Sequence, residues 1–240
     1  MNLTDRQIQL LRAIIEEYIE TAQPVGSETV ERKHGLAVSP ATIRNEMVAL
    51  TKEGYLKKPH ASAGRIPTPM ALKYYVHHLL ETENLPVSEE VSVKQQIWDV
   101  RHKKQQLLRE ATRALAQKSN MLSLVVTDQG ELYYAGAANI LDFPEFYDID
   151  LTRNLLLLLD KISFWQNIFR QPVGEDPFYL IVGEDFGGEA MFTTCGMLYA
   201  KFRVQDETGM IGVIGPCRLR YRRLIPMIRY FGELLTEIGR

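Results

Sequence analysis

The chain has 240 residues, with 28 lysines and arginines against 30 aspartates and glutamates, so its formal net charge at pH 7 is −2. This balance excludes a uniformly basic nucleic-acid coat, and two cysteines outside a CxxC pair support neither a disulfide framework nor a structural zinc site. The longest leucine run is far shorter than a membrane span, and the polar first residues are unlike a signal peptide, so we expect a cytoplasmic protein without a membrane partner.

The first two predicted helices are recognised by the signals at their ends. Thr4 and Gln7 have the spacing of a capping box, which predicts a helix that runs to about Thr21. Ser27 can cap a short second helix, which Gly35 ends. A third helix is expected to follow closely.

The third predicted helix has two faces of opposite chemistry. Ser39 can act as its N-cap and Gly54 can supply the left-handed residue that closes it. An apolar stripe predicted to face inward consists of Ile43, Met47 and Leu50. The outward face carries Arg44 and Asn45, which can grip guanine and adenine through paired hydrogen bonds in a major groove.

A small hairpin between Tyr55 and Ile66 completes the order helix, helix, helix, hairpin, which is typical of a winged helix-turn-helix domain. Residues 1–31 carry a net charge of −4, whereas residues 32–80 carry +6. The sequence therefore predicts a DNA-binding face, formed by Ser39, Thr42, Arg44, Asn45, Lys52, Lys57, Lys58, His60, Ser62 and Arg65. The alternatives are an ordinary solvated face and a domain that serves only protein association.

The pattern changes after the hairpin. Thr68 and Pro69 can begin a further helix, and the segment 83–86 resembles a domain boundary. Residues 88–119 contain neither glycine nor proline, and their apolar residues recur near a 3-4 repeat, which predicts one long helix. We expect this helix, together with the C-terminal domain, to provide dimer contacts.

The remaining residues predict an antiparallel sheet with helices packed on it, so the fold class is α+β. The β-rich runs are 122–127, 132–136, 178–182, 197–204 and 210–214. Two helices are expected, over 151–169 and 222–238. The predicted domains are a winged-helix domain over 1–82, a linker helix over 83–120 and a regulatory domain over 121–240.

Several strings in this chain, among them residues 39–47 and 59–68, resemble the HrcA family of bacterial heat-inducible transcription repressors. In the N-terminal part they are residues 3–7, 18–21, 24–27, 39–47, 54–56 and 59–68. In the C-terminal part they are residues 136–146 and 212–216, followed by Arg218, Tyr221, Ile225-Pro226 and Arg229-Tyr230.

The resemblance implies a homodimeric repressor with a GAF-like C-terminal domain. Such a repressor binds double-stranded DNA at an inverted-repeat operator upstream of heat-shock and chaperone genes, with help from the GroE chaperonin. Family members are longer chains with an inserted domain that contributes to dimerisation. The chain differs from them in the middle, where much of the first half of the GAF-like domain and the insert are missing.

Enzyme-like signals are weak, and no cofactor or catalytic residue is expected. Adjacent His77 and His78 lack the glutamate of a zinc-protease motif, and the acidic residues between 142 and 150 are better explained as caps and hydrogen-bond acceptors than as a metal loop. The basic run 218–223 could pair with acidic residues or face DNA, but solvated surface is the default interpretation. The alternative function is a regulator whose GAF-like domain senses a small metabolite.

Overall fold

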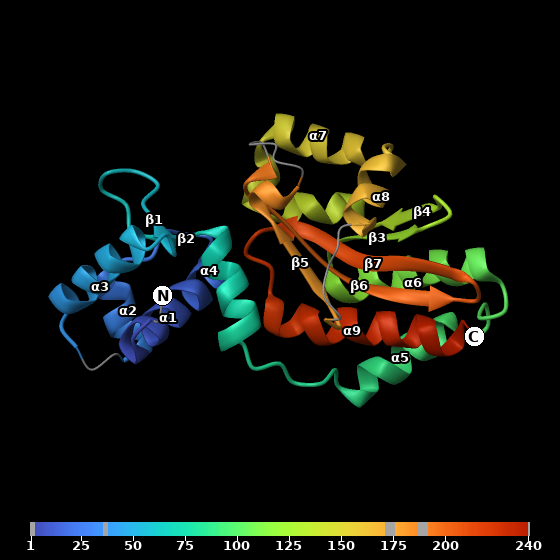
Figure 1. Cartoon of the computed structure of the whole chain (residues 1–240), viewed down its shortest axis with the longest axis horizontal. Helices are drawn as coiled ribbons and strands as arrows, with labels where there is room; N and C mark the ends of the chain where they lie inside the picture. Colours follow the sequence, from blue (N-terminus) through green and yellow to red (C-terminus); the bar gives the residue numbers. More distant parts are fainter. Residues whose placement is uncertain (1–2, 36–37, 171–175, 187–191, 240) are drawn as a thin grey trace. The chain divides into compact units, whose positions relative to one another are not determined.

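The computed structural model describes residues 3–35, 38–170, 176–186 and 192–239 (Figure 1). The chain divides into two compact units, Met1–Glu81 and Thr82–Arg240. No helix in these described ranges has the length and apolar character needed to cross a membrane.

The N-terminal unit is a group of helices beside a two-stranded hairpin. Its elements are α1 (Asp5–Thr21), α2 (Ser27–His34), α3 (Pro40–Lys52), β1 (Leu56–Lys57), β2 (Ile66–Pro67) and α4 (Pro69–Tyr74), which continues as a π-helical turn, Tyr75–Leu79. The predicted capping box is confirmed, because the Gln7 amide donates to Thr4 Oγ1 at 3.3 Å and the Thr4 amide donates to Gln7 Oε1 at 3.0 Å.

The predicted limits of α3 are also confirmed. The Thr42 amide donates to Ser39 Oγ at 3.2 Å, and Gly54 has a φ of 85°, which glycine adopts without strain. The stripe of Ile43, Met47 and Leu50 is buried. The expected cap of α2 is wrong, since Gly26 occupies the N-cap position and Ser27 is already helical.

The β1–β2 loop, which we define as residues 58–65, is tied to the segment before α2. Val25 and Arg65 exchange two backbone hydrogen bonds of 2.8 and 2.9 Å. A side chain at Gly64 would collide with the Val25 carbonyl. Glycine at this position therefore allows the two backbones to approach closely.

The C-terminal unit is built on a five-stranded antiparallel sheet with the order β4-β3-β7-β6-β5. Its strands are β3 (Leu122–Thr127), β4 (Leu132–Ala135), β5 (Tyr179–Val182), β6 (Cys195–Val204) and β7 (Glu207–Pro216). Its helices are α5 (Val87–Trp98), α6 (Lys104–Ser119), α7 (Ile149–Leu158), α8 (Ile162–Arg170) and α9 (Tyr221–Ile238). Short 3₁₀ turns are Ala137–Asp142, Pro144–Tyr147 and Gly183–Asp185.

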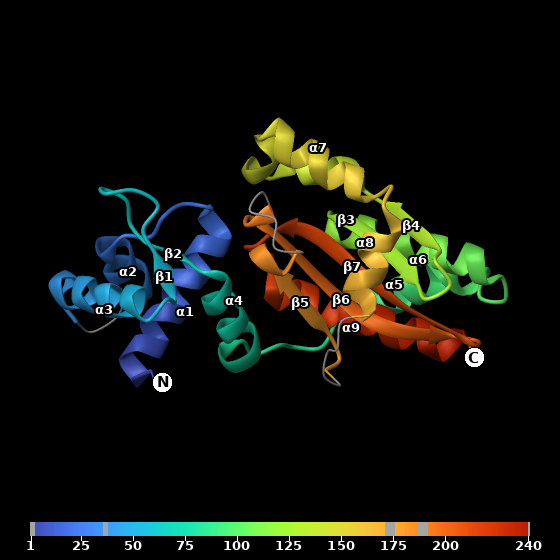
Figure 2. The same ribbon diagram turned by 45° about the horizontal axis from the view of Figure 1, so that its top comes forward.

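Helices cover both faces of this sheet. In Figures 1 and 2, α7 and α8 lie on one face, α6 and α9 lie on the other, and α5 packs outside α6 and α9. All residues of β3 are buried, as expected for a strand covered on both sides. The predicted combination of helices and an antiparallel sheet is thus confirmed.

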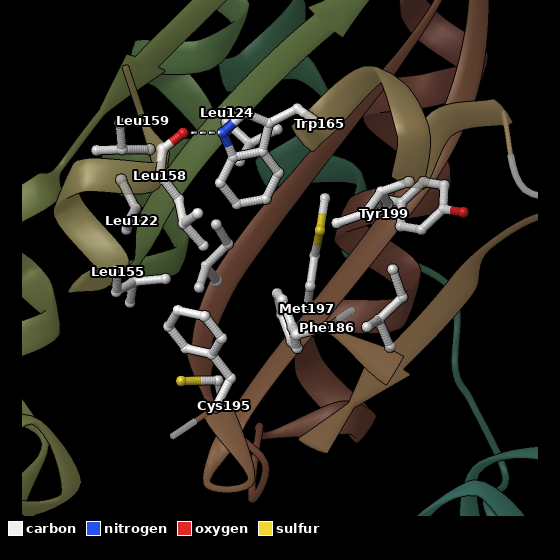
Figure 3. Close-up of a cluster of buried hydrophobic side chains, with 14 of the residues drawn as sticks. Leu122, Leu124, Leu155, Leu158, Leu159, Trp165, Phe186, Cys195, Met197 and Tyr199 are labelled. Carbon is white, nitrogen blue, oxygen red and sulfur yellow. Dashed lines mark hydrogen bonds between the residues drawn. The ribbon is translucent and has the colours of Figure 1, made fainter. Parts of the chain in front are cut away.

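Trp165 lies at the centre of the α7/α8 side of the core (Figure 3). Its side chain is fully buried beside Leu122, Leu124 and Leu158, and its indole Nε1 donates a 2.7 Å hydrogen bond to the Leu158 carbonyl. This bond connects α8 to the end of α7 and satisfies the polar atom of an otherwise apolar ring.

The long helix expected over 88–119 is wrong, because the chain reverses between α5 and α6. The two helices pack together, with Gln96 Nε2 donating to Gln117 Oε1 at 3.1 Å and Lys118 Nζ donating to Ser92 Oγ at 2.9 Å. Lys104, at the start of α6, is held by an ion pair with Glu207. Both helices bury apolar residues within the same unit. The 3-4 spacing of apolar residues therefore continues through residues 88–119, although the helix itself is interrupted.

The single helix expected over 151–169 is likewise wrong. It is divided into α7 and α8 by a turn in which the Lys161 amide donates to the Leu158 carbonyl at 2.9 Å. The turn brings Trp165 back onto the end of α7, where the buried indole can reach its acceptor.

We expect the C-terminal unit to lose stability in alkali. Burial raises the pKa of Cys195 from 9.0 to about 12 and that of Tyr199 from 10.0 to about 12. The unfolded chain therefore releases both protons at a lower pH than the native chain, and the free energy of unfolding should fall as the pH rises from about 9 to 12. Urea unfolding at several pH values measures this slope.

The variants Cys195→Ala and Tyr199→Phe should each reduce the alkaline slope, even if they lower the stability at neutral pH. Tyr134→Phe removes a half-exposed phenol from the same unit, and it serves as the matched control. An alkaline slope that is unchanged in both core variants would contradict this prediction.

Candidate nucleic-acid interface

Three elements of the N-terminal unit surround one groove. The groove has a volume of about 380 Å³ and lies among the start of α2, the middle of α3 and the β1–β2 loop. Its cationic side chains are Arg44, Lys58 and Arg65. Two elements, α3 and the β1–β2 loop, therefore direct positive charge toward one concave surface, while the start of α2 adds the acidic Glu28.

Most of the side chains predicted to bind DNA are accessible. Those of Ser39, Arg44, Asn45, Lys52, Lys57, Lys58, His60 and Ser62 are exposed, whereas Thr42 and Arg65 are partly buried. The structure thus places these residues on α3 and on the adjoining hairpin of one unit.

Arg44 and Asn45 lie on the exposed side of α3, away from its buried stripe. In the described part of the chain, neither side chain has a hydrogen bond or an ion pair with another residue. The nearby Glu46 carboxylate is instead 3.6 Å from Arg6 Nη1. The guanidinium and amide groups are consequently available to an external partner.

Two of the predicted binding residues also support the local fold. Ser39 Oγ caps α3 and lies 3.1 Å from Thr42 Oγ1. Arg65 Nε donates to Thr51 Oγ1 at 3.1 Å, and this hydroxyl donates in turn to the Met47 carbonyl at 2.7 Å. Arg65 therefore fixes the base of the β1–β2 loop against α3.

The start of α2 was not among the predicted binding residues. Its N-cap is Gly26, which provides no side-chain cap, so the first amides of the helix lack helical partners at the edge of the groove. Thr29 also lines the groove. The string 24–27 contained this signal, because its proline and glycine mark a helix start without a capping side chain at the N-cap.

The C-terminal unit has a smaller hollow between the end of α6 and the start of α9. It measures about 230 Å³ and contains three arginines, Arg218, Arg220 and Arg223, beside the apolar residues Met121 and Leu224. Within the described ranges, Arg220 has no side-chain partner, whereas Arg223 Nη2 donates to the Lys118 carbonyl at 3.0 Å.

The default interpretation of the basic run as solvated surface is wrong for Arg218. Its Nε and Nη2 donate to the two carboxylate oxygens of Glu145, at 2.5 and 3.0 Å. This paired geometry links the segment before α9 to the turn before α7.

The acidic residues between 142 and 150 act as the sequence predicted. Asp142 accepts a hydrogen bond from Asn120, and Asp148 caps α7 by accepting from the Asp150 and Leu151 amides. The described residues contain no group of three histidine, cysteine or acidic side chains arranged to hold a metal ion.

Replacing Lys57 by alanine should weaken DNA binding with little change in sequence preference. Lys57 is exposed on β1, where it can neutralise a backbone phosphate. Losing one such contact should reduce the slope of log affinity against log salt concentration by about 0.9 per protomer. Fluorescence anisotropy across a salt series measures the slope.

Lys161→Ala is the matched control, because it removes an exposed lysine from the C-terminal unit. A fall in the salt slope of similar size in both variants would contradict the placement of Lys57 at the interface.

Three comparisons with known proteins bear on this surface and its fold. The family model described as "HrcA protein C terminal domain" matches residues 77–225. The protein "Heat-inducible transcription repressor HrcA" of Desulforudis audaxviator (strain MP104C) is 27% identical over 339 aligned positions, covering 99% of this chain and 98% of that protein. Because this chain has 240 residues, the relative contains positions without a counterpart here.

A solved structure described as "Crystal structure of a hypothetical protein at 2.2 A resolution" has a TM-score of 0.74 to this chain. It is 18% identical, and the alignment covers 99% of this chain and 100% of that chain. At this identity the likeness shows a shared fold.

Proposed function

The chain belongs to the HrcA family of transcription repressors, which are not enzymes, and from this premise we propose that it represses genes by binding an inverted-repeat operator as a dimer. The observation that carries the proposal is the exposed pair Arg44 and Asn45, which have no side-chain partner on the described surface. Both residue types can read base edges through paired hydrogen bonds.

We assign the N-terminal unit the role of a winged helix-turn-helix domain. In this proposal α3 enters the major groove, where Arg44 and Asn45 contact bases and Thr42 lies nearby. Lys57, Lys58, His60 and Ser62 hold the DNA backbone or the minor groove, and Lys52 and Arg65 add positive charge. The unpaired amides at the start of α2 favour a phosphate beside the groove.

The regulated genes are inferred from the similarity to a heat-inducible repressor. We propose heat-shock and chaperone genes as targets and a GAF-like role for the C-terminal unit. Assistance by the GroE chaperonin belongs to the same proposal, and adding GroE to refolding repressor should then increase the fraction of protein that binds the operator.

The proposal is tested by fluorescence anisotropy with a duplex that carries the family's inverted repeat, beside a scrambled duplex and a single half-site. Tight binding that requires both half-sites supports a dimeric, sequence-specific repressor. Equal and salt-sensitive binding to all three duplexes would contradict it. A protein that binds none of the three duplexes would favour a domain that serves only protein association.

The arginine-lined hollow favours a second candidate function, the sensing of a small anionic metabolite. Arg220 and Arg223 could hold a carboxylate or phosphate, while Met121 and Leu224 contact an apolar part of the same molecule. A panel of small carboxylates and phosphates tests this candidate. A ligand that raises the thermal stability and also changes operator affinity supports it, whereas a panel without such a ligand counts against it.

A further inference from the structure

The outward face of α5 carries an exposed apolar stripe. Val87, Val91 and Trp98 are 73%, 48% and 41% exposed, and their spacing of four and seven residues places them on one side of the helix. Val93 and Ile97, on the opposite side, are buried against the unit. The helix is therefore apolar on two faces, only one of which its own unit covers.

Trp98 is held in position at the end of this stripe. The Arg101 guanidinium carbon lies 4.3 Å from the centre of the indole ring, and Arg101 Nη1 donates to the Trp98 carbonyl at 2.8 Å. Lys94 Nζ lies 5.6 Å from the same ring. Tryptophan and arginine are enriched among the residues that dominate binding energy at protein interfaces. A side chain whose orientation is already fixed also loses less conformational entropy on binding.

We propose that this face binds the α5 helix of a second copy of the chain in an antiparallel pair. The inference rests on the proposed function, since an inverted repeat is matched by a twofold protein dimer. Val91 and Trp98 lie two helical turns apart, so an axis between Lys94 and Gln95 places Val91 of each copy against Trp98 of the other.

The charges of α5 favour this orientation. Glu89 and Glu90 lie in its first turn, whereas Arg101 and Lys103 follow its last turn. An antiparallel pair places the acidic start of each helix near the basic end of the other, while a parallel pair would bring like charges together. Lys94 lies on the same side of the helix, midway between Val91 and Trp98, but its charge is paired within its own unit, because its Nζ lies 3.0 Å from the Glu237 carboxylate on α9.

The exposed stripe on α7 is less suited to self-association. Ile149 and Leu157 are 76% and 43% exposed, but the exposed Arg153 lies midway between them. A twofold axis that matched Ile149 to Leu157 would place the two Arg153 side chains together. This surface supplies a control of similar exposure and composition.

The test combines sedimentation equilibrium with acrylamide quenching of tryptophan fluorescence over one range of protein concentrations. The chain has two tryptophans, and Trp165 is fully buried, so quenching reports on Trp98. We expect a monomer–dimer equilibrium in which quenching decreases several-fold as dimer forms. A monomer at all concentrations, or a dimer in which Trp98 remains equally accessible, would overturn the inference.

Val91→Glu and Trp98→Glu should each raise the dimer dissociation constant by roughly 100-fold or more, because each change occurs twice per interface. Both positions are exposed in the monomer, and circular dichroism verifies folding. Ile149→Glu is the matched control and should leave dimerisation unchanged. Weakening by the control as strong as by Trp98→Glu, or no weakening by either α5 variant, would also overturn the inference.

DNA binding separates this inference from the proposed function. Trp98→Glu should lose the preference for two half-sites over one while still preferring one half-site to a scrambled duplex. If the unmodified protein prefers both half-sites and Trp98→Glu keeps that preference, the α5 interface is wrong and the repressor proposal stands. If the unmodified protein prefers none of the duplexes, the repressor proposal fails regardless of α5.

Discussion

Replacing Arg44 by alanine is expected to abolish most of the preference for the operator while leaving affinity for a scrambled duplex nearly unchanged. A two-pronged contact between arginine and guanine contributes about 1–3 kcal/mol of discrimination. Because the proposed dimer would contact two half-sites, the loss on the full operator should be about twice as large. Anisotropy titrations with both duplexes at one salt concentration measure the difference.

Two further variants show whether Arg44 acts through its geometry or only through its charge. Arg44→Lys keeps the positive charge but lacks the planar fork, so it should also lose most of the operator preference. Arg153→Ala removes an exposed arginine from the C-terminal unit and should have no effect on DNA binding. An equal loss of affinity for both duplexes in Arg44→Ala would show that Arg44 contacts only phosphates.

Replacing Trp165 by alanine should be among the most destabilising single changes in the C-terminal unit. The change removes a fully buried ring from the core and leaves the Leu158 carbonyl without its indole donor. Tryptophan-to-alanine changes in cores cost about 3–5 kcal/mol, which corresponds to a lowering of the melting temperature by roughly 6–20 °C for a unit of this size. Differential scanning calorimetry measures the shift.

Trp165→Phe divides this effect into its two parts. It keeps most of the apolar ring but removes the hydrogen bond, so its loss of stability should be clearly smaller than that of Trp165→Ala. Equal losses in the two variants would show that the Leu158 contact dominates, and a melting temperature unchanged in both would contradict the central place of this residue in the core.

Local signals in the sequence predicted the N-terminal elements well. Three of these signals depend only on atoms within a few residues, so the local sequence is sufficient to predict them. They are the capping box at Thr4, the cap at Ser39 and the left-handed Gly54. The two helix breaks were missed for the opposite reason. The reversal between α5 and α6 depends on packing between distant residues, such as Lys104 and Glu207, which a periodic pattern does not contain.

The same division applies to the candidate interface. The chemistry of Arg44 and Asn45 could be predicted because helical spacing places them opposite a buried stripe. The second role of Arg65 could not, since its bond to Thr51 forms only when the hairpin folds back on α3. Arg218 shows the same limit, because its carboxylate partner is distant in the sequence.

The two backbone hydrogen bonds between Val25 and Arg65 fix the base of the β1–β2 loop, whereas the side chains at the tip of the loop can vary. These bonds hold the base of the β1–β2 loop by main-chain atoms, which any substitution elsewhere in the loop retains. The side chains of Lys58, His60 and Ser62 extend beyond that anchor and are exposed. Substitutions at the tip, together with those on the outward side of α3, can therefore change the proposed DNA contacts without disturbing the backbone that holds the loop in place.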